Sequence, residues 1–202
     1  TAVRVGRPLT IDGDLSDWPE GPQIVLDGTE GNHIEGWRGP NDLSAKIRLA
    51  WDGSALYFGA EVVDDVHRQD HEGFDIWRGD CIQIGFDPFL DTVRGYDEND
   101  VEIGLALTKF GPQAFIWFPK PERPCPEVEV SVKRKGNLTV YEASIPWRLL
   151  GVEPSAGFRL AFSLTVNESD TGKFEGWLEW TPGICGGKDA SSFGALALKG
   201  GG

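Results

Sequence analysis

Alternation of apolar and polar side chains in short segments constrains the fold of this chain more than any other feature. Ile47, Leu49 and Trp51 alternate with Lys46 and Arg48. A period of two residues sends successive side chains to opposite faces of a β-strand, so that one face packs on a core while the other meets solvent. The pattern therefore predicts a strand with one buried face.

The same strand character is found along the whole chain, in segments bounded by turn residues. The sequence holds 27 glycines and 13 prolines, and these residues interrupt regular structure and form turns. Asp52-Gly53 and Gly136-Asn137 are typical of hairpin turns. The predicted strands are residues 45–51, 55–63, 80–86, 100–108, 113–118, 128–134, 138–145, 159–166, 177–180 and 194–198.

Helical character is confined to one short segment. Pro146 suits the first turn of a helix, and Gly151 suits its end about one turn later. Many short strands with almost no helix predict an all-β chain that folds as a single jelly-roll-like β-sandwich of two mainly antiparallel sheets. We expect the domain to span residues 1–199, followed by a glycine tail at residues 200–202.

Acidic residues dominate the charge of the chain, which is −13 in total. Nucleic acid is excluded as a partner because phosphate binding needs a basic surface, and anionic membranes are disfavoured for the same reason. A neutral ligand or a cation suits this charge better. No run of 18 apolar residues and no signal peptide is present, so we interpret the chain as a mature or excised module of a larger protein.

Three predicted strands carry small or neutral side chains on the face opposite their apolar side. Small residues leave room above a sheet, whereas a plain solvated face carries long charged side chains. Two interpretations stay open: a ligand occupies this shallow face, or neighbouring loops pack on it. The residues on this face are Cys81, Gln83, Gly85, Glu102, Gly104, Ala106, Ala161, Ser163 and Thr165.

The eight tryptophans matter because flat C–H faces of sugars stack on indole rings, while sugar hydroxyls need planar polar partners. Trp77 lies in a polar loop before the strand that carries Gln83, and Trp180 ends a strand before the loop 181–188. Aromatic residues at strand ends are placed to contact ligands, so both are candidate ligand-binding residues. Trp18 is expected to plug the end of the sandwich. Of the others, Trp51 and Trp147 are expected to be structural, and open cases are Trp37, Trp117 and Trp177.

Acidic and amide side chains follow several of the predicted strands. Asp64 follows one strand, Asp80 begins another, and Asn167 and Asp170 follow a third. Clustered carboxylate and amide oxygens suit Ca²⁺, which takes 6–8 oxygen ligands. We therefore predict a structural calcium ion near these four residues; the alternative is ordinary turn chemistry, in which Asp and Asn bond their own backbone.

The sequence carries no motif of a catalytic site. The GxSxG, HExxH, P-loop and GxGxxG patterns are all missing. His33, His67 and His71 fall in predicted loops, and we expect His67 and His71 at the surface. A disulfide between Cys125 and Cys185, which lie in Pro- and Gly-rich loops, stays open. The chain is predicted not to be an enzyme.

Short motifs follow one another in a fixed order along nearly the whole chain. They are Ile11-Asp12-Gly13-Asp14 with Trp18, Ala50-Trp51-Asp52 with Leu56-Tyr57-Phe58, Val63-Asp64-Asp65, Trp77-Arg78-Gly79-Asp80, Ile82-Gln83-Ile84, Phe86-Asp87-Pro88, Ser144-Ile145-Pro146-Trp147, Trp180, Gly187-Lys188-Asp189 and Phe193-Gly194. In this order they resemble the family 9 carbohydrate-binding modules and their relatives in the DOMON-like superfamily.

The resemblance implies a jelly-roll-like sandwich with bound calcium, in which two tryptophans clamp one or two sugar units at a chain end. Trp77 matches the first of these tryptophans. Trp180 matches the second, with Trp177 as the alternative.

Two positions depart from the family pattern. Gln83 stands where the family has an acidic residue, and Gly104 stands where it has an arginine. Glu102, two residues earlier on the same face, compensates for the lost charges in our interpretation.

We therefore expect a non-catalytic module that binds a neutral glycan and belongs to a larger secreted, glycan-active protein, outside the cell or in the periplasm. One alternative is a structural domain without a ligand, in which Trp77 and Trp180 are buried in packing. The other is a haem-binding electron-transfer domain, which the absence of methionine disfavours.

Overall fold

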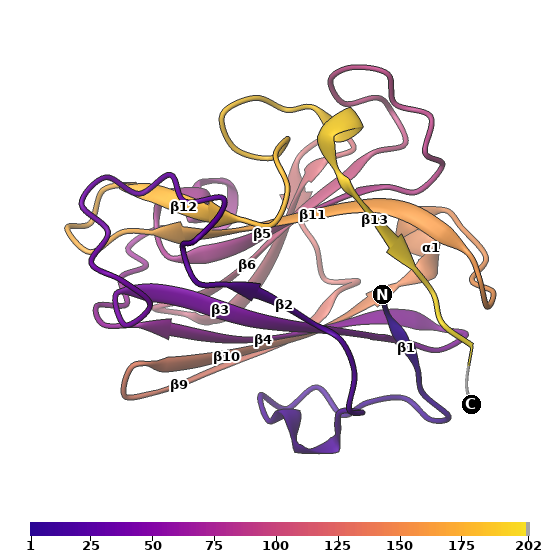
Figure 1. Ribbon diagram of the computed structural model, residues 1–202, viewed down its shortest axis with the longest axis horizontal. Helices are drawn as coiled ribbons and strands as arrows, with labels where there is room; N and C mark the ends of the chain where they lie inside the picture. The colour runs from indigo at the N-terminus through magenta and orange to yellow at the C-terminus, as the bar shows by residue number, and fades with distance from the viewer. Residues whose placement is uncertain (201–202) are drawn as a thin grey trace.

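Two β-sheets packed face to face make up the structure, a computed structural model that describes residues 1–200 (Figure 1). The first sheet has the order β1-β3-β4-β10-β9, with β2 added on β3; the second has the order β12-β11-β5-β6-β7-β8, with β13 added on β11. All neighbouring strands run antiparallel except β1 and β3. The strands are β1 (Val3–Arg4), β2 (Gln23–Leu26), β3 (Leu43–Trp51), β4 (Ala55–Asp64), β5 (Cys81–Asp87), β6 (Val101–Thr108), β7 (Gly111–Phe118), β8 (Arg123–Pro124), β9 (Glu129–Lys135), β10 (Leu138–Pro146), β11 (Arg159–Glu168), β12 (Gly176–Glu179) and β13 (Gly194–Ala197).

The predicted all-β sandwich of two mainly antiparallel sheets is confirmed, with 44% strand and 8% helix. Each strand predicted from the sequence is present within two residues at either end. The strands β1, β2 and β8 were not predicted, because two to four residues are too few to show a period of two.

Helices are short and lie at the connections. The predicted helix is α1 (Trp147–Leu150), which ends at Gly151 in the left-handed conformation, with φ of 68°, a conformation that glycine adopts without steric cost. Three 3₁₀ helices were not predicted: η1 (Leu15–Asp17), η2 (Gly73–Arg78) and η3 (Ala190–Ser192). Within residues 1–200 the structure contains no helix with the length and apolar character needed to cross a membrane.

The core lies between the two sheets and is made by the apolar faces read from the sequence. In the second sheet, Ile84 of β5 pairs with Ile103 of β6 on one side and with Leu164 of β11 on the other. All three side chains are fully buried. Because the apolar positions are in register across neighbouring strands, one face of this sheet is continuously apolar and the other face is left for polar and small residues.

The N-terminal segment covers the outer face of the first sheet. The Trp18 ring lies on Gly59 of β4, where an added Cβ would be 2.9 Å from the indole. Its Nε1 donates to Oε1 of Glu142 at 2.7 Å, and the other oxygen of that carboxylate accepts from the backbone N–H of Asp12 and Gly13. Trp18 is therefore structural as predicted, but it packs on the outer face of a sheet and does not plug the end of the sandwich.

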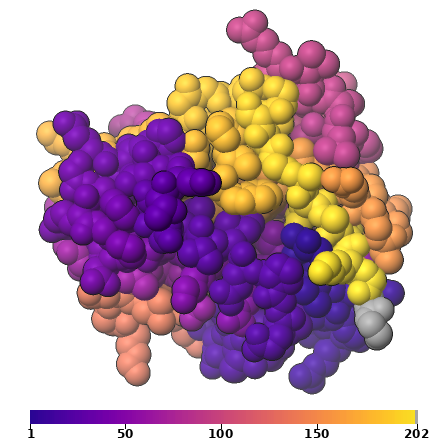
Figure 2. Space-filling view, viewed as in Figure 1, coloured from indigo at the N-terminus to yellow at the C-terminus, as the bar shows by residue number. Residues whose placement is uncertain are grey.

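Loops stand on the outer face of the second sheet. The loop after β12 and the loop between β5 and β6 rise from it side by side (Figure 2), joined by hydrogen bonds from the Ala190 N–H to the Gly95 carbonyl and from the Gly95 N–H to Asp189. Aromatic rings from covering segments occupy the space above glycines of this face: an added Cβ would lie 2.3 Å from Trp117 at Gly104. Loop packing thus accounts for part of the small-residue face, and a pocket lies over the rest.

Candidate functional site

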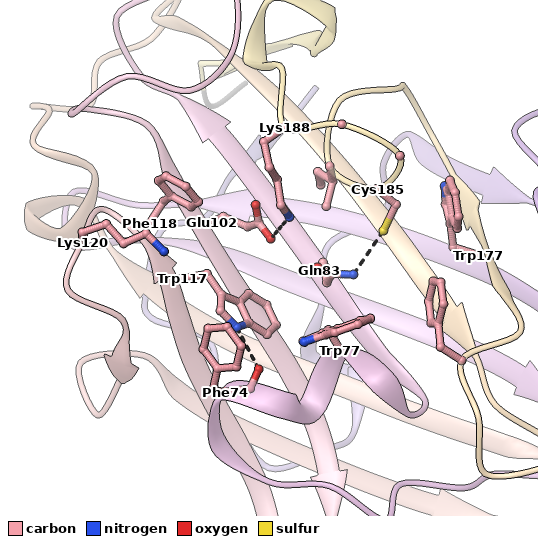
Figure 3. Close-up of a pocket in the computed structure, with 14 residues that line it drawn as sticks. Phe74, Trp77, Gln83, Glu102, Trp117, Phe118, Lys120, Trp177, Cys185 and Lys188 are labelled. Atoms are coloured by element: carbon pink, nitrogen blue, oxygen red, sulfur yellow. Dashed lines mark hydrogen bonds and ion pairs between the residues drawn. The ribbon is translucent and has the colours of Figure 1, made fainter.

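A pocket of about 420 Å³ opens on the outer face of the second sheet (Figure 3). This volume falls in the range of small-molecule sites, roughly 300–1,000 Å³. Strands β5 and β6 form its floor, and its walls come from η2, β7 and the segments on either side of β12. The aromatic residues that line it are Phe74, Trp77, Trp117, Phe118, Phe174 and Trp177.

Trp77 forms one wall of the pocket from the 3₁₀ helix η2. Its indole is half-buried and faces the pocket, while the preceding residue Ile76 is fully buried beneath the helix. Gln69 donates from Nε2 to the Ile76 carbonyl at 2.8 Å, and Asn167 donates from Nδ2 to the Trp77 carbonyl at 2.8 Å. These bonds attach the helix to the sheet, so the indole is held in place by the backbone that carries it.

Trp177 of β12 forms the other wall. Its Nε1 donates to Glu179 Oε2 at 2.9 Å, and the His33 ring stacks on the indole with centroids 4.6 Å apart. The same carboxylate binds His33 Nε2 through Oε1 at 2.8 Å, so Glu179 holds both rings. Phe174 lies 6.0 Å from Trp177 and 5.8 Å from Trp77, which makes one continuous aromatic surface between the two walls.

Trp180 lies on the opposite side of β12 and does not line the pocket. It packs against the core residue Phe162, with ring centroids 5.6 Å apart, and against Gly194. Side chains three residues apart along a strand point to opposite faces. Trp177 faces outward, so Trp180 lies on the core face together with Leu178. The structure therefore does not bring Trp180 to the pocket beside Trp77, as first expected, but brings Trp177 there, the alternative that the resemblance offered.

The floor of the pocket carries two buried polar groups, both predicted from the sequence. Gln83 is 3% exposed, and its Nε2 donates to Asn167 Oδ1 at 3.2 Å and to Cys185 Sγ at 3.3 Å. Glu102 is fully buried and accepts from Lys188 Nζ at 2.5 Å. Because both N–H groups of Gln83 are used within the protein, its carbonyl oxygen is the group it offers to a ligand.

Four of the five predicted ligand-binding residues, Trp77, Gln83, Glu102 and Trp177, thus come together. Two residues that line the pocket, Lys188 and Phe174, were not predicted as ligand-binding residues. Lys188 lies in the loop that follows Trp180, and Phe174 lies in the loop before β12. No period exists in a loop, so the sequence offers no signal for where such side chains point.

The cysteines do not form the disulfide left open above. Cys125 is buried in the core between the sheets, whereas Cys185 lines the pocket, and both are free thiols. Burial raises the pKa of Cys185 to about 11, so its thiol is neutral at physiological pH and acts as a weak hydrogen-bond partner of Gln83.

An acidic cluster lies beside the pocket at the ends of β4, β5 and β11. Ligand atoms of Asp64, Glu168 and Asp170 lie within 4.8 Å of one another, as do those of Asp64, His67 and Asp80. Burial raises the pKa of Asp80 to about 8 and that of Glu168 to about 10, and the neighbouring carboxylates add to both shifts. Buried oxygens of Asp80, Glu168 and Asp170 have no hydrogen-bond donor among residues 1–200.

Two expectations about this cluster are corrected. Asn167 belongs to the pocket network, because its side chain binds Trp77 and Gln83; the next residue, Glu168, points to the other face of β11 and joins the cluster instead. His67 is not a surface residue: its side chain is 12% exposed, and Nδ1 lies 3.4 Å from Asp80.

Comparison with known proteins agrees with this architecture. A family model described as carbohydrate family 9 binding domain-like matches residues 11–201. The chain belongs to this family. Family 9 modules bind carbohydrate and are not catalytic, so the prediction of a non-enzymatic carbohydrate-binding module is confirmed.

Relatives of this family 9 module occur within larger proteins. The chain is 26% identical over 199 residues to endo-1,4-beta-xylanase A of Thermotoga neapolitana and 25% identical to the enzyme of the same name from Thermotoga maritima. In both cases the match covers 97% of this chain and 17% of the xylanase, so the module corresponds to a small part of those enzymes.

Solved structures share its fold. A family 9 module from Caldicellulosiruptor kristjanssonii in complex with cellotriose has a TM-score of 0.75 at 22% identity, covering 98% of this chain and 93% of that one. A family 9 module from the same organism in complex with glucose has the same score and identity, covering 99% and 95%. A putative carbohydrate-binding protein from Bacteroides uniformis has a TM-score of 0.58 at 14% identity, covering 88% and 86%.

Proposed function

We propose that the pocket between Trp77 and Trp177 binds a neutral glycan, stacking one or two sugar units on the two indoles above the floor formed by Gln83 and Glu102. The observation that carries this proposal is the combination of two half-exposed indoles with buried polar groups between them. The C–H face of a sugar ring packs on an aromatic surface, and its hydroxyls bond the polar floor.

The charge of the chain and its relatives narrow the choice of ligand. A net charge of −13 disfavours acidic polysaccharides. The Caldicellulosiruptor modules of the same fold are complexed with cellotriose and glucose, and the Thermotoga relatives are xylanases. Cello-oligosaccharides and xylo-oligosaccharides, presented at a chain end, are therefore the first ligands to test.

Isothermal titration calorimetry of the parent and Trp77→Ala with cellotriose and xylotriose tests the proposal. We expect parental dissociation constants between about 1 μM and 1 mM, because the contacts are few, and a loss of most of this affinity in Trp77→Ala, because buried aromatic anchors dominate small sites. Lys135→Gln, on β9 of the other sheet, is the control and should bind as the parent does. Equal binding by Trp77→Ala and the parent would refute the assignment of this wall.

We also propose a structural calcium ion at the acidic cluster, held by Asp64, Asp80, Glu168 and Asp170. The residues fit a hard cation, since buried oxygens of Asp80, Glu168 and Asp170 lack donors among residues 1–200 and carboxylate oxygens are the ligands that Ca²⁺ prefers. Asp64 adjoins them, although its own oxygens already accept from the Val66 N–H and from Arg134. A bound cation would offset their mutual repulsion. Asp80 follows η2, so the same ion would steady the segment that carries Trp77.

The parent of this module is proposed to be a larger, secreted glycan-active protein, extracellular or periplasmic. Support comes from the Thermotoga relatives, in which the matched region is a minor part. Mass spectrometry of culture supernatant and periplasmic fractions from the source organism tests this: peptides of this chain should appear there in a polypeptide well above 22.1 kDa.

A further inference from the structure

We propose that Lys188 contacts the ligand in the pocket and that Glu102 is the buried counter-ion that positions Lys188, so that the site selects sugars with neutral hydroxyls and rejects sugars that carry a carboxylate. The inference rests on the proposed function, since it names the ligand class of the same pocket.

Lys188 reaches into the pocket from the loop after β12. Figure 3 shows its side chain descending beside Gln83 toward Glu102. Its Nζ lies 2.5 Å from Glu102 Oε1 and 6.0 Å from the centre of the Tyr96 ring. An ammonium group has three N–H donors, and Glu102 is its one hydrogen-bond acceptor within residues 1–200. The side chain is 42% exposed, so donors remain for a ligand.

Glu102 fixes where that ammonium group lies. Its side chain is 1% exposed on the floor of the pocket, and Oε2 is buried without a donor among residues 1–200. A buried carboxylate without a compensating charge is strongly unfavourable, so the side chain of Lys188 is drawn down to the floor instead of extending into solvent. Burial raises the pKa of the neighbouring Tyr96, and the Glu102 charge raises it further; the phenol is therefore neutral, and Lys188 is the cation that lies against Glu102.

Pairing of these two charges defines the ligand class. A sugar hydroxyl both accepts and donates, so it can accept from Lys188 while its own hydrogen turns to Glu102 or to the carbonyl oxygen of Gln83. A carboxylate has no hydrogen to donate and would compete with Glu102 for the same ammonium group, at a distance where two negative charges repel. The second lysine of the pocket, Lys120, is paired with Glu122, so its charge too is matched by a carboxylate of the protein.

Titration calorimetry with two matched probes tests the proposal: cellotriose, and the β-1,4-linked trisaccharide of glucuronic acid, which has the same linkage and a carboxylate on each ring. The parent should bind cellotriose at least about tenfold more tightly. Lys188→Gln should weaken cellotriose binding about tenfold, since the sugar loses a hydrogen bond from a charged, partly exposed donor. Lys135→Gln removes the same charge from the other sheet and should change neither affinity.

Glu102→Gln is the decisive variant, because it keeps the shape of the side chain and frees the charge of Lys188. It should bind the glucuronic acid trisaccharide about tenfold more tightly than the parent does. A gain of affinity is a readout that loss of folding cannot produce. If melting curves show that this variant does not fold, the parental preference and Lys188→Gln, whose side chain is partly exposed, decide the matter.

The outcomes separate this inference from the proposed function. If the parent binds cellotriose and Lys188→Gln binds it equally well, Lys188 is not a ligand contact, and the inference fails while the proposed function stands. Equal parental affinity for the two trisaccharides overturns the selectivity in the same way. If the parent binds neither trisaccharide nor xylotriose, the proposed function fails and the inference fails with it.

Discussion

Replacing Trp177 and Trp180 one at a time separates the pocket wall from the core. The two residues are three positions apart, and the structure gives them opposite roles. Trp177 lines the pocket and is held by Glu179, whereas Trp180 packs on Phe162 of the core at a centroid distance of 5.6 Å. Trp177→Ala should therefore impair binding, and Trp180→Ala should impair stability.

The sizes of the two effects follow from these contacts. An aromatic anchor in a small site contributes about 2 kcal/mol or more, so Trp177→Ala should raise the dissociation constant about 30-fold. A buried Trp replaced by Ala costs about 3–5 kcal/mol, and the partial exposure of Trp180 favours the lower value. For a domain of this size about 3 kcal/mol lowers the melting temperature by roughly 6–12 °C.

The assay pairs calorimetric titration of the best-binding oligosaccharide with thermal unfolding followed by circular dichroism. Trp177→Ala should melt within about 4 °C of the parent, because it loses one hydrogen bond to Glu179 and the partly exposed ring contacts with His33 and Phe174 but no core packing. Trp180→Ala should melt much lower and bind, below its transition, as the parent does. The reasoning is refuted if Trp180→Ala abolishes binding with an unchanged melting temperature while Trp177→Ala binds normally.

Three further effects are expected from the packing and the charges. Gly104→Ala should lower the free energy of unfolding by about 2 kcal/mol in urea titrations, because its Cβ would lie 2.3 Å from Trp117; an unchanged midpoint would contradict this packing. Glu142→Ala should cost about 3 kcal/mol in the same assay, since it removes the acceptor of the Trp18 indole and of backbone N–H groups, and a loss below about 1 kcal/mol would argue against that role. Calcium should raise the melting temperature, chelator should reverse the rise, and Glu168→Gln should abolish it. The pKa of Glu168 is raised to about 10 in the folded chain, so the folded state holds this proton more tightly than the unfolded state, whose pKa is near 4. Without metal, the stability that this proton contributes is fully present below about pH 4 and is lost as the pH rises toward 10. The stabilisation by calcium should therefore grow from pH 5 to pH 9, and a melting temperature indifferent to calcium across this range would exclude the site.

Much of the fold was predictable because the alternation that marks a strand can be read from a few consecutive residues. The alternation in β5, β6 and β11 assigned each residue to the core face or the outer face, and the structure agrees at Ile84, Ile103 and Leu164. The same alternation put Gln83 and Glu102 on one face, where they now lie on the floor of one pocket. These predictions succeeded because successive side chains of a strand point to opposite faces, so that the position of a residue in the strand sets the face on which it lies.

The sequence did contain a signal that points to Trp177 and away from Trp180 as the second pocket tryptophan. If residues 177–180 form a strand, Trp177 and Trp180 cannot share a face, and Leu178 places Trp180 on the apolar side. Which of the two reaches the pocket depends on the pairing of β12 with β11, where Trp177 stands opposite Asn167.

What the sequence by itself determined is the all-β class, the division of each strand into two faces, and the identity of the residues on the outer face of the second sheet. Only the tertiary structure decided that Trp177 closes the pocket, that Glu168 and not Asn167 joins the acidic cluster, and that Lys188 pairs with Glu102. Each of these contacts involves a loop or a strand end, where no period fixes the direction of a side chain. Their partners lie as far as 104 positions away along the chain, as Glu168 does from Asp64, so the packing of the whole sandwich brings them together.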